Sequence, residues 1–236
     1  MSDSPIDIFD SAHKRALAFL EVGKSGPKSK DNLRAAVVFA VAAVDTFFRV
    51  KIIKYLKEQR EKRDSTFKMS PAAQKLVREI LSKKSFRKEY RDITKTDKDM
   101  VDVFVASSNS KLISHLEDAL EQESFQGIDK ISDAFKIMDK NPPEIWGKFD
   151  ASTKLKKPKR KKGPGRPFKS KLGKKIDAKT QMERMFKKRH FIAHQADVVI
   201  SGKKLVGKLR KIEYSTVRRW LEHSRKAIHE INKLIA

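Results

Sequence analysis

The residues best suited to chemistry lie in one short stretch, Arg189-His190-Phe191-Ile192-Ala193-His194. An arginine guanidinium stays protonated and can hold a phosphate through two parallel hydrogen bonds. A histidine imidazole can take up or release a proton near neutral pH. Together, the guanidinium of Arg189 and the imidazoles of His190 and His194 supply the minimal chemistry for breaking a phosphodiester bond.

The spacing of Arg189 and His194 restricts how they can act together. On a straight helix, side chains five residues apart point about 140° away from each other. One regular helix therefore cannot bring both side chains to one phosphate. Either the helix bends or begins near the motif, or two copies of the chain share the site.

Three interpretations fit these residues. In the first, an imidazole moves a proton at the ribose 2′-OH or the leaving 5′-oxygen, and the guanidinium stabilises charge on the phosphorane. In the second, His190, His194 and Asp197 bind a metal ion, although no flanking glutamate supplies the base of a zinc-hydrolase helix motif. In the third, Arg189 and His194 only cap a helix end and form ion pairs there.

Charge and composition indicate the class of partner. The 236 residues carry a formal net charge of +25, which favours a polyanion: nucleic acid first, an anionic membrane surface second. The absence of cysteine excludes disulfides and is consistent with a reducing, intracellular setting. Residues 1–10 show no secretory signal, and the longest apolar run, 35–44, is too short to span a bilayer. We expect a cytoplasmic protein, or a nuclear one in a eukaryote, with no membrane partner.

The elements that must position the motif are predicted to be all-α. Ser4-Pro5 and Ser70-Pro71 are each typical of an N-cap followed by proline at the first helical position. Residues 35–48 are apolar nearly all round, which predicts a buried central helix capped by Asp31. Asp45 lies inside this helix. A buried carboxylate must pair with a cation, face a polar cleft or lie at a dimer seam.

Further helices are predicted along the second half of the chain. Apolar periodicity indicates helices over 100–121 and from Ile128 until Asn141-Pro142-Pro143 ends the helix, with a short turn after it. A helix from 178 to 188 runs into the motif, and the last helix follows from 217. Residues 198–207 fit a small β-hairpin and an extended loop equally well.

Residues 154–175 differ in kind from the rest. They hold 12 lysines or arginines and no acid, and removing them leaves a net charge of +13, which is 25 less 12. Such a segment cannot bury enough apolar surface to order itself, so we interpret it as a flexible basic insertion. It divides one helical domain into an N-terminal part, 1–153, and a C-terminal part, 176–236.

The basic insertion is a candidate nucleic-acid-binding segment. Its core, Gly163-Pro164-Gly165-Arg166-Pro167, resembles an AT-hook, with Pro164 where the first groove-reading arginine belongs. Residues 157–162 also resemble a nuclear-import signal; in a bacterial protein they would be an electrostatic tether, and a solvated linker without a partner is the remaining alternative. The candidate contacts to phosphates are Lys159, Arg160, Lys161, Lys162, Arg166 and Lys169.

Residues 188–197 are similar to the signature of HEPN domains, which is an arginine, a polar residue straight after it, and a histidine separated from the arginine by four to six residues. The form Arg-His-x-Ile-x-His-x-x-Asp resembles the branch called RiboL-PSP-HEPN. The likeness extends in outline over 31–236, including an early helix with an acidic residue among small apolar ones. Ala193 replaces the commoner valine, and the basic insertion is not a general family feature.

This resemblance implies a fold, an activity and roles for individual residues. It implies an α-helical bundle that dimerises and cleaves RNA without a metal ion or other cofactor, giving a 2′,3′-cyclic phosphate and a 5′-OH. Arg189 and His194 match the two essential positions, His190 matches the polar second position, and Asp45 matches the early acidic position loosely. Many HEPN proteins are toxins or defence effectors, and some only bind nucleic acid.

The sequence therefore predicts an all-α, HEPN-type endoribonuclease that acts on RNA as a homodimer. We expect a toxin or an antiviral defence effector, and an antitoxin that covers its cleft is a further expected partner. The alternative is a HEPN protein without catalysis that binds RNA or DNA through residues 154–175.

Overall fold

The computed structural model describes residues 4–26, 28–61, 69–81, 101–102, 104, 110–152, 178–194, 198–201, 204–209 and 211–236. In this part of the chain the fold is all-α, as predicted, with one two-stranded hairpin added. The helices are α1 (Pro5–Val22), α2 (Ser29–Glu61), α3 (Pro71–Leu81), α7 (Ser110–Gln122), α8 (Ile128–Ile137), α9 (Pro142–Ser152), α10 (Ala178–His194) and α11 (Tyr214–Leu234).

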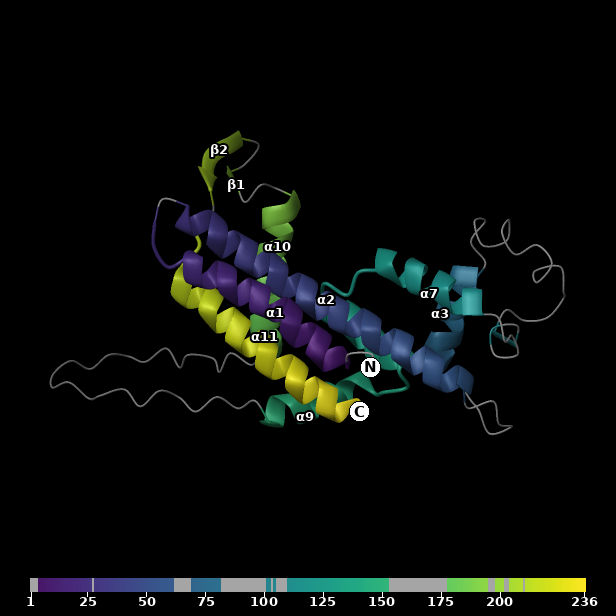
Figure 1. Cartoon of the computed structure of the whole chain (residues 1–236). Coiled ribbons are helices and arrows are strands. Elements are labelled where there is room, and N and C mark those ends of the chain that lie inside the picture. The colour runs from purple at the N-terminus through teal and green to yellow at the C-terminus, as the bar shows by residue number, and fades with distance from the viewer. Residues whose placement is uncertain are drawn as a thin grey trace.

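The long helix α2 is the centre of the bundle. Its 33 residues pack against α1, α10 and α11, and α7 and α8 lie against it as well. Figure 1 shows α1 and α11 running beside it. The predicted buried helix is confirmed for most of 35–48. One strip of α2 faces solvent. On it, Phe39 is 36% exposed and stacks on Phe19 of α1, with ring centroids 4.9 Å apart.

The two predicted helix starts at serine-proline are confirmed. Ser4 caps α1, because its hydroxyl accepts the amide of Asp7 and the Asp7 carboxylate accepts the amide of Ser4. Ser70 Oγ accepts the amide of Ala73 at 3.1 Å at the start of α3. The predicted cap Asp31 is wrong: α2 begins at Ser29, so Asp31 lies in the first turn, where its carboxylate pairs with Arg34 at 3.2 Å.

The two adjacent prolines begin a helix, whereas the sequence predicted that they end one. The helix α8 already ends at Ile137, and Asp139 turns the chain with a left-handed φ of 57°. Pro142-Pro143 then occupy the first turn of α9, where a missing amide hydrogen leaves no helical bond unmade. The predicted short turn is in fact an 11-residue helix whose Trp146 and Phe149 are buried.

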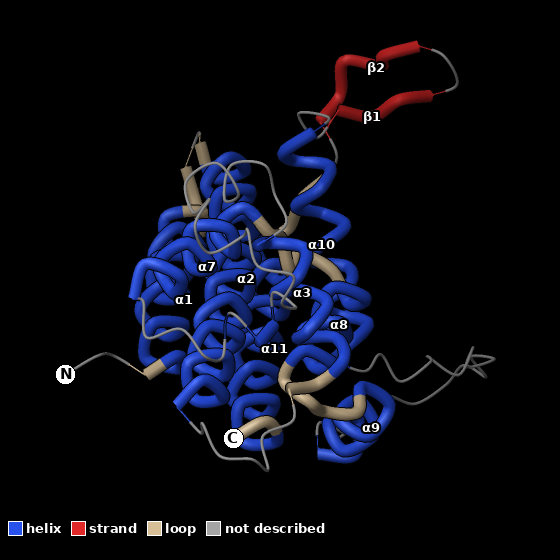
Figure 2. The backbone as a smooth tube through the Cα atoms, turned by 90° about the vertical axis from the view of Figure 1, so that its right-hand side faces the viewer, coloured by secondary structure: helices blue, strands red, loops and turns tan. Residues whose placement is uncertain are grey.

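The stretch after α10 is a β-hairpin, which settles the choice between hairpin and loop. Its strands are β1 (Val198–Ser201) and β2 (Lys204–Leu209), paired antiparallel with Ile200 opposite Leu205. Figure 2 shows the hairpin projecting beyond the helices at the end of α10.

The two predicted parts of the helical domain pack together. Helices α10 and α11 contact α2, and α11 also contacts α1 and α9. The basic insertion 154–175 lies outside the described residues, so its flexibility and its AT-hook-like role stay predictions. No helix in the described part of the chain is both long enough and apolar enough to span a membrane.

Candidate functional site

The motif forms the last turn and a half of α10. The helix runs unbroken from Ala178 to His194, so it neither begins nor breaks at Arg189. The predicted alternative in which a helix begins near the motif is therefore wrong. On a continuous helix, positions 189 and 194 lie about 140° apart around the axis. A bend in α10 and a site shared between two copies both stay predictions.

Arg189 lies on the face of α10 that packs into the bundle. It is half-buried and follows Met182, Met185 and Phe186, which are 1%, 0% and 6% exposed, on that face. Its guanidinium makes no hydrogen bond or ion pair within the described part of the chain. A guanidinium can donate two parallel hydrogen bonds to an external anion.

One histidine of the motif, His190, lies on another side of the helix. His190 is exposed, and its ring centroid is 6.1 Å from that of Phe191. His194 is the last residue of α10; its side chain lies outside what the structure describes, as does Asp197. No group of three or more histidine, aspartate or glutamate side chains among the described residues is placed to hold a metal ion.

Helix α10 is strongly basic. Its single acid, Glu183, pairs with Lys187 at 2.8 Å. The motif lies at the negative end of the helix dipole, which stabilises cations and weakly opposes a phosphate. Affinity for phosphate must therefore come from the side chains. The basic residues of α10 are Lys179, Arg184, Lys187, Lys188 and Arg189.

Asp45 makes contacts of a structural kind. One carboxylate oxygen pairs with Arg49 Nη2 at 2.5 Å, and the other accepts the amide of Phe125. Gln126 lies 3.4 Å from the first oxygen, and Arg49 donates onward to the carbonyl of Glu123 at 3.0 Å. The sequence left three surroundings open for Asp45, and the structure shows the one in which its carboxylate pairs with a cation. In the described part of the chain its contacts fasten the α7–α8 connection to α2, and none reaches α10.

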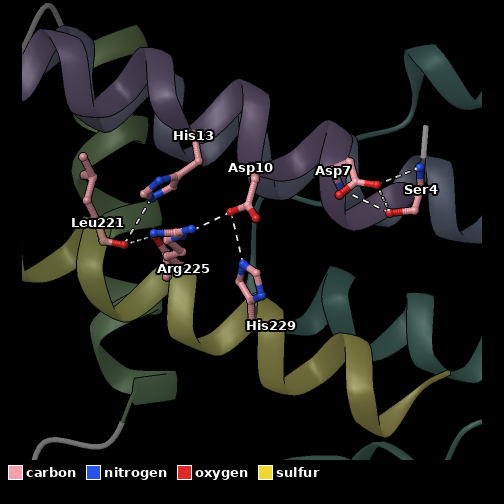
Figure 3. Close-up of polar contacts among 8 residues, drawn as sticks. Ser4, Asp7, Asp10, His13, Leu221, Arg225 and His229 are labelled. Carbon is pink, nitrogen blue, oxygen red and sulfur yellow. Dashed lines mark hydrogen bonds and ion pairs between the residues drawn. The ribbon is translucent and has the colours of Figure 1, made fainter.

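A polar cluster between α1 and α11 was missed by the sequence analysis (Figure 3). The Asp10 Oδ1 atom accepts from Arg225 Nε and from His229 Nε2, each at 3.1 Å. Burial raises the pKa of Asp10, but the hydrogen bonds and charges of His229 and Arg225 outweigh burial and lower it. The sequence shows that Arg225 and His229 are one helical turn apart. Their partner, Asp10, lies 215 and 219 residues away in the sequence, so no local pattern connects it to them.

His13 fastens the same two helices from inside. It is 1% exposed, and its Nε2 lies 3.2 Å from the carbonyl oxygen of Leu221. Burial lowers the pKa of His13, with Arg225 acting in the same direction, while the Leu221 carbonyl and Asp10 oppose it. A carbonyl only accepts, so the proton of the neutral ring lies on Nε2. This histidine therefore serves the fold of the α1–α11 pair.

No family model matches the chain, and comparison finds neither a similar curated protein nor a similar solved structure. The resemblance to HEPN domains therefore rests on the motif and on the outline of the sequence.

Proposed function

We propose that this protein is a metal-independent endoribonuclease of the HEPN type. The observation that carries the proposal is the complete Arg-x4-His motif at the end of α10, with the guanidinium of Arg189 half-buried and without a described partner. Phosphodiester cleavage requires a fixed cation and an imidazole that can carry a proton, and the motif supplies both kinds of group.

In the proposed reaction, one imidazole accepts the proton of the ribose 2′-OH, and the 2′-oxygen then attacks the adjacent phosphorus. The bond from phosphorus to the 5′-oxygen breaks, and that oxygen takes a proton to become the 5′-OH product. The other product is a 2′,3′-cyclic phosphate, so no water is consumed. Arg189 stabilises the negative charge that grows on the phosphorane oxygens, and His194 and His190 are the candidate proton carriers.

Two copies of the chain are proposed to form the site. Arg189 and His194 diverge by about 140° on one helix, so a second protomer that brings its own α10 across a cleft supplies the missing group. The high positive charge would hold RNA near the paired motifs. We propose a toxin or defence effector acting in the cytoplasm, with an antitoxin covering the cleft in the resting cell.

The test is cleavage of RNA by the purified protein in excess chelator. We expect cleavage to persist, with 2′,3′-cyclic phosphate ends, and Arg189→Ala and His194→Ala each to reduce the rate by about 100-fold or more. The matched control is Lys187→Ala, which removes one cation from the exposed side of the same helix. Cleavage abolished by the chelator, or unchanged in both motif variants, contradicts the proposal.

The second candidate is a nucleic-acid-binding protein without catalysis. The observation that favours it is the run of 12 cations in 154–175 with its AT-hook-like core. Deleting 154–175 should then lower the affinity and flatten its salt dependence, by roughly 0.7 in log–log slope for each phosphate of single-stranded RNA that is no longer neutralised. Affinities for RNA and for A·T-rich duplex DNA, measured side by side, distinguish the two candidates. An unchanged slope counts against this one.

A further inference from the structure

A hollow of about 400 Å³ lies at the opposite end of the bundle from the motif. Its walls come from the second half of α2, the turn after α8 and the end of α11. The motif precedes the start of α11, and the 21 residues of that helix span about 30 Å. Figure 1 shows the hairpin and the end of α11 at opposite ends of the molecule. The hollow is therefore separate from the proposed nuclease site.

Three lysines converge on this hollow. Lys51 and Lys54 come from one face of α2, and Lys140 comes from the turn between α8 and α9. Lys51 and Lys140 are half-buried, and neither ammonium forms an ion pair with another described residue. Lys54 reaches Glu58 at 3.8 Å. Glu58 is the one acidic side chain in the lining as the structure describes it, and Ala236 adds its terminal carboxylate, so the three lysines exceed the negative charges by one.

The backbone fixes one of these lysines in place. Asp139 adopts φ 57°, a left-handed conformation that aspartate tolerates better than most residues. The amide of Lys140 then donates to the carbonyl of Phe135 at 2.8 Å. This closed turn brings Met138 and Lys140 to the wall of the hollow. The third cation therefore comes from a short, hydrogen-bonded turn.

The lysines around the hollow repel one another. Burial lowers the pKa of Lys51, and the charges of Lys54 and Lys140 lower it further, opposed by Glu58. Three like charges around one cavity repel each other, and a bound anion would remove that repulsion. Structural ion pairing does not account for Lys51 and Lys140, since neither is ion-paired with an acid among the described residues.

We propose that this hollow binds a small organic phosphate monoester. Its phosphate would lie among Lys51, Lys54 and Lys140, and its organic part against Met138 and Ile235, which line the same cavity. The cavity volume falls in the range of small-molecule sites. RNA fits less well, because a site that follows a nucleic-acid backbone spreads its cations along an extended groove, whereas these three lysines line one hollow of about 400 Å³.

The experiment is calorimetric titration of the full chain with adenosine 5′-monophosphate as the probe and adenosine as its neutral match. We expect saturable binding of one monophosphate per chain and none of adenosine. The combined variant Lys51→Met with Lys140→Gln should weaken binding by about tenfold or more, since each removes a charge-assisted contact. The matched variant Lys24→Gln with Lys28→Gln removes two exposed charges at the other end of α2 and should change affinity by less than about twofold.

A second measurement keeps the test valid if the lysine variant folds poorly. Acetylation of lysines in the unmodified protein, read by mass spectrometry, should slow at Lys51 and Lys140 when the monophosphate is added and stay unchanged at Lys24. Absence of saturable binding, equal weakening by both pairs of substitutions, or stronger protection of Lys51 by a short RNA than by the monophosphate overturns the proposal. RNA cleavage by the motif is measured separately and does not affect this result.

Discussion

The clearest case at the scale of single residues is Asp45, a carboxylate in the core. Its side chain is 6% exposed, and it holds both Arg49 and the amide of Phe125. Removing one member of a buried pair leaves the other charge and the amide without their partner. We therefore expect Asp45→Ala to lower the free energy of unfolding by about 3 kcal/mol. This value is at the lower end of the cost of breaking a buried ion pair, because the side chain of Arg49 is 25% exposed. Urea denaturation measures the change.

The control for Asp45 lies on the same helix. Asp31 pairs with Arg34 at 3.2 Å, but its carboxyl is 74% exposed. Asp31→Ala should therefore cost less than about 1 kcal/mol. If the two substitutions cost the same, the contacts of Asp45 do not stabilise the fold as argued.

His13 predicts how stability changes with pH. Its pKa is lowered in the folded protein from an ordinary value of 6.5, so the unfolded chain binds more protons below that value. The contribution of His13 is therefore complete above pH 6.5 and is lost as the pH falls below it. Melting temperatures between pH 7.5 and 5 should fall more steeply for the unmodified protein than for His13→Gln.

Two other groups must be separated from His13 in that experiment. Burial also lowers the pKa of His223, followed by the charge of Lys226, so His223 adds a destabilisation of the same sign. The lowered pKa of Asp10 acts only below its ordinary value of 3.8. The melting temperature of a variant with both His13→Gln and His223→Gln should depend on pH even less than that of His13→Gln. A slope that is the same in all three proteins contradicts the assignment.

The contacts of single residues were predictable only where the partner lies within about one helical turn in the sequence. The sequence showed that Asp45 needed a partner, and Arg49 lies one turn further along the same helix. The amide of Phe125 is 80 residues away, and no pattern points to it. At the motif, residue types and spacing identified the candidates, but the half-buried position of Arg189 depends on how α10 packs.

At the scale of elements, the two serine caps differ in what they hold. Ser4 caps α1 at the surface. Ser70 is 4% exposed; it caps α3 and also donates to the carbonyl of Ile137 at 2.9 Å, which joins α3 to the end of α8. We expect Ser4→Ala to cost about 1 kcal/mol and Ser70→Ala about 2 kcal/mol, because the second leaves buried groups unsatisfied. Chemical denaturation of both variants tests the order, and the reverse order contradicts it.

Helix starts were predictable where cap and proline occur together, as at 4–5 and 70–71. The same logic failed at Pro142-Pro143, because a proline pair that cannot continue one helix is equally suited to begin the next. The sequence could not distinguish a hairpin from a loop over 198–207, because strands this short show too little alternation of apolar and polar residues.

At the scale of the whole molecule, the proposed shared site makes a quantitative prediction. If each site takes Arg189 from one protomer and His194 from the other, a heterodimer of Arg189→Ala and His194→Ala chains has one intact site and one doubly substituted site. Equal mixing under exchange conditions should therefore restore about a quarter of the unmodified activity. Each variant mixed with itself is the control. No recovery on mixing, with heterodimers shown to form, would place both groups in one protomer.

The contact of α1 with α11 has a consequence for synthesis. His13 needs the carbonyl of Leu221, and Asp10 needs Arg225, which the ribosome adds 215 residues later. At cellular elongation rates that interval is about 10 to 40 s. During it, the nascent chain exposes the faces of α1 and α2 that α11 will cover, and the motif is complete only for the last 31 residues, which is 225 less 194. We expect this interval to be when chaperones engage the chain, and the proposed site to be incomplete until α11 closes the bundle.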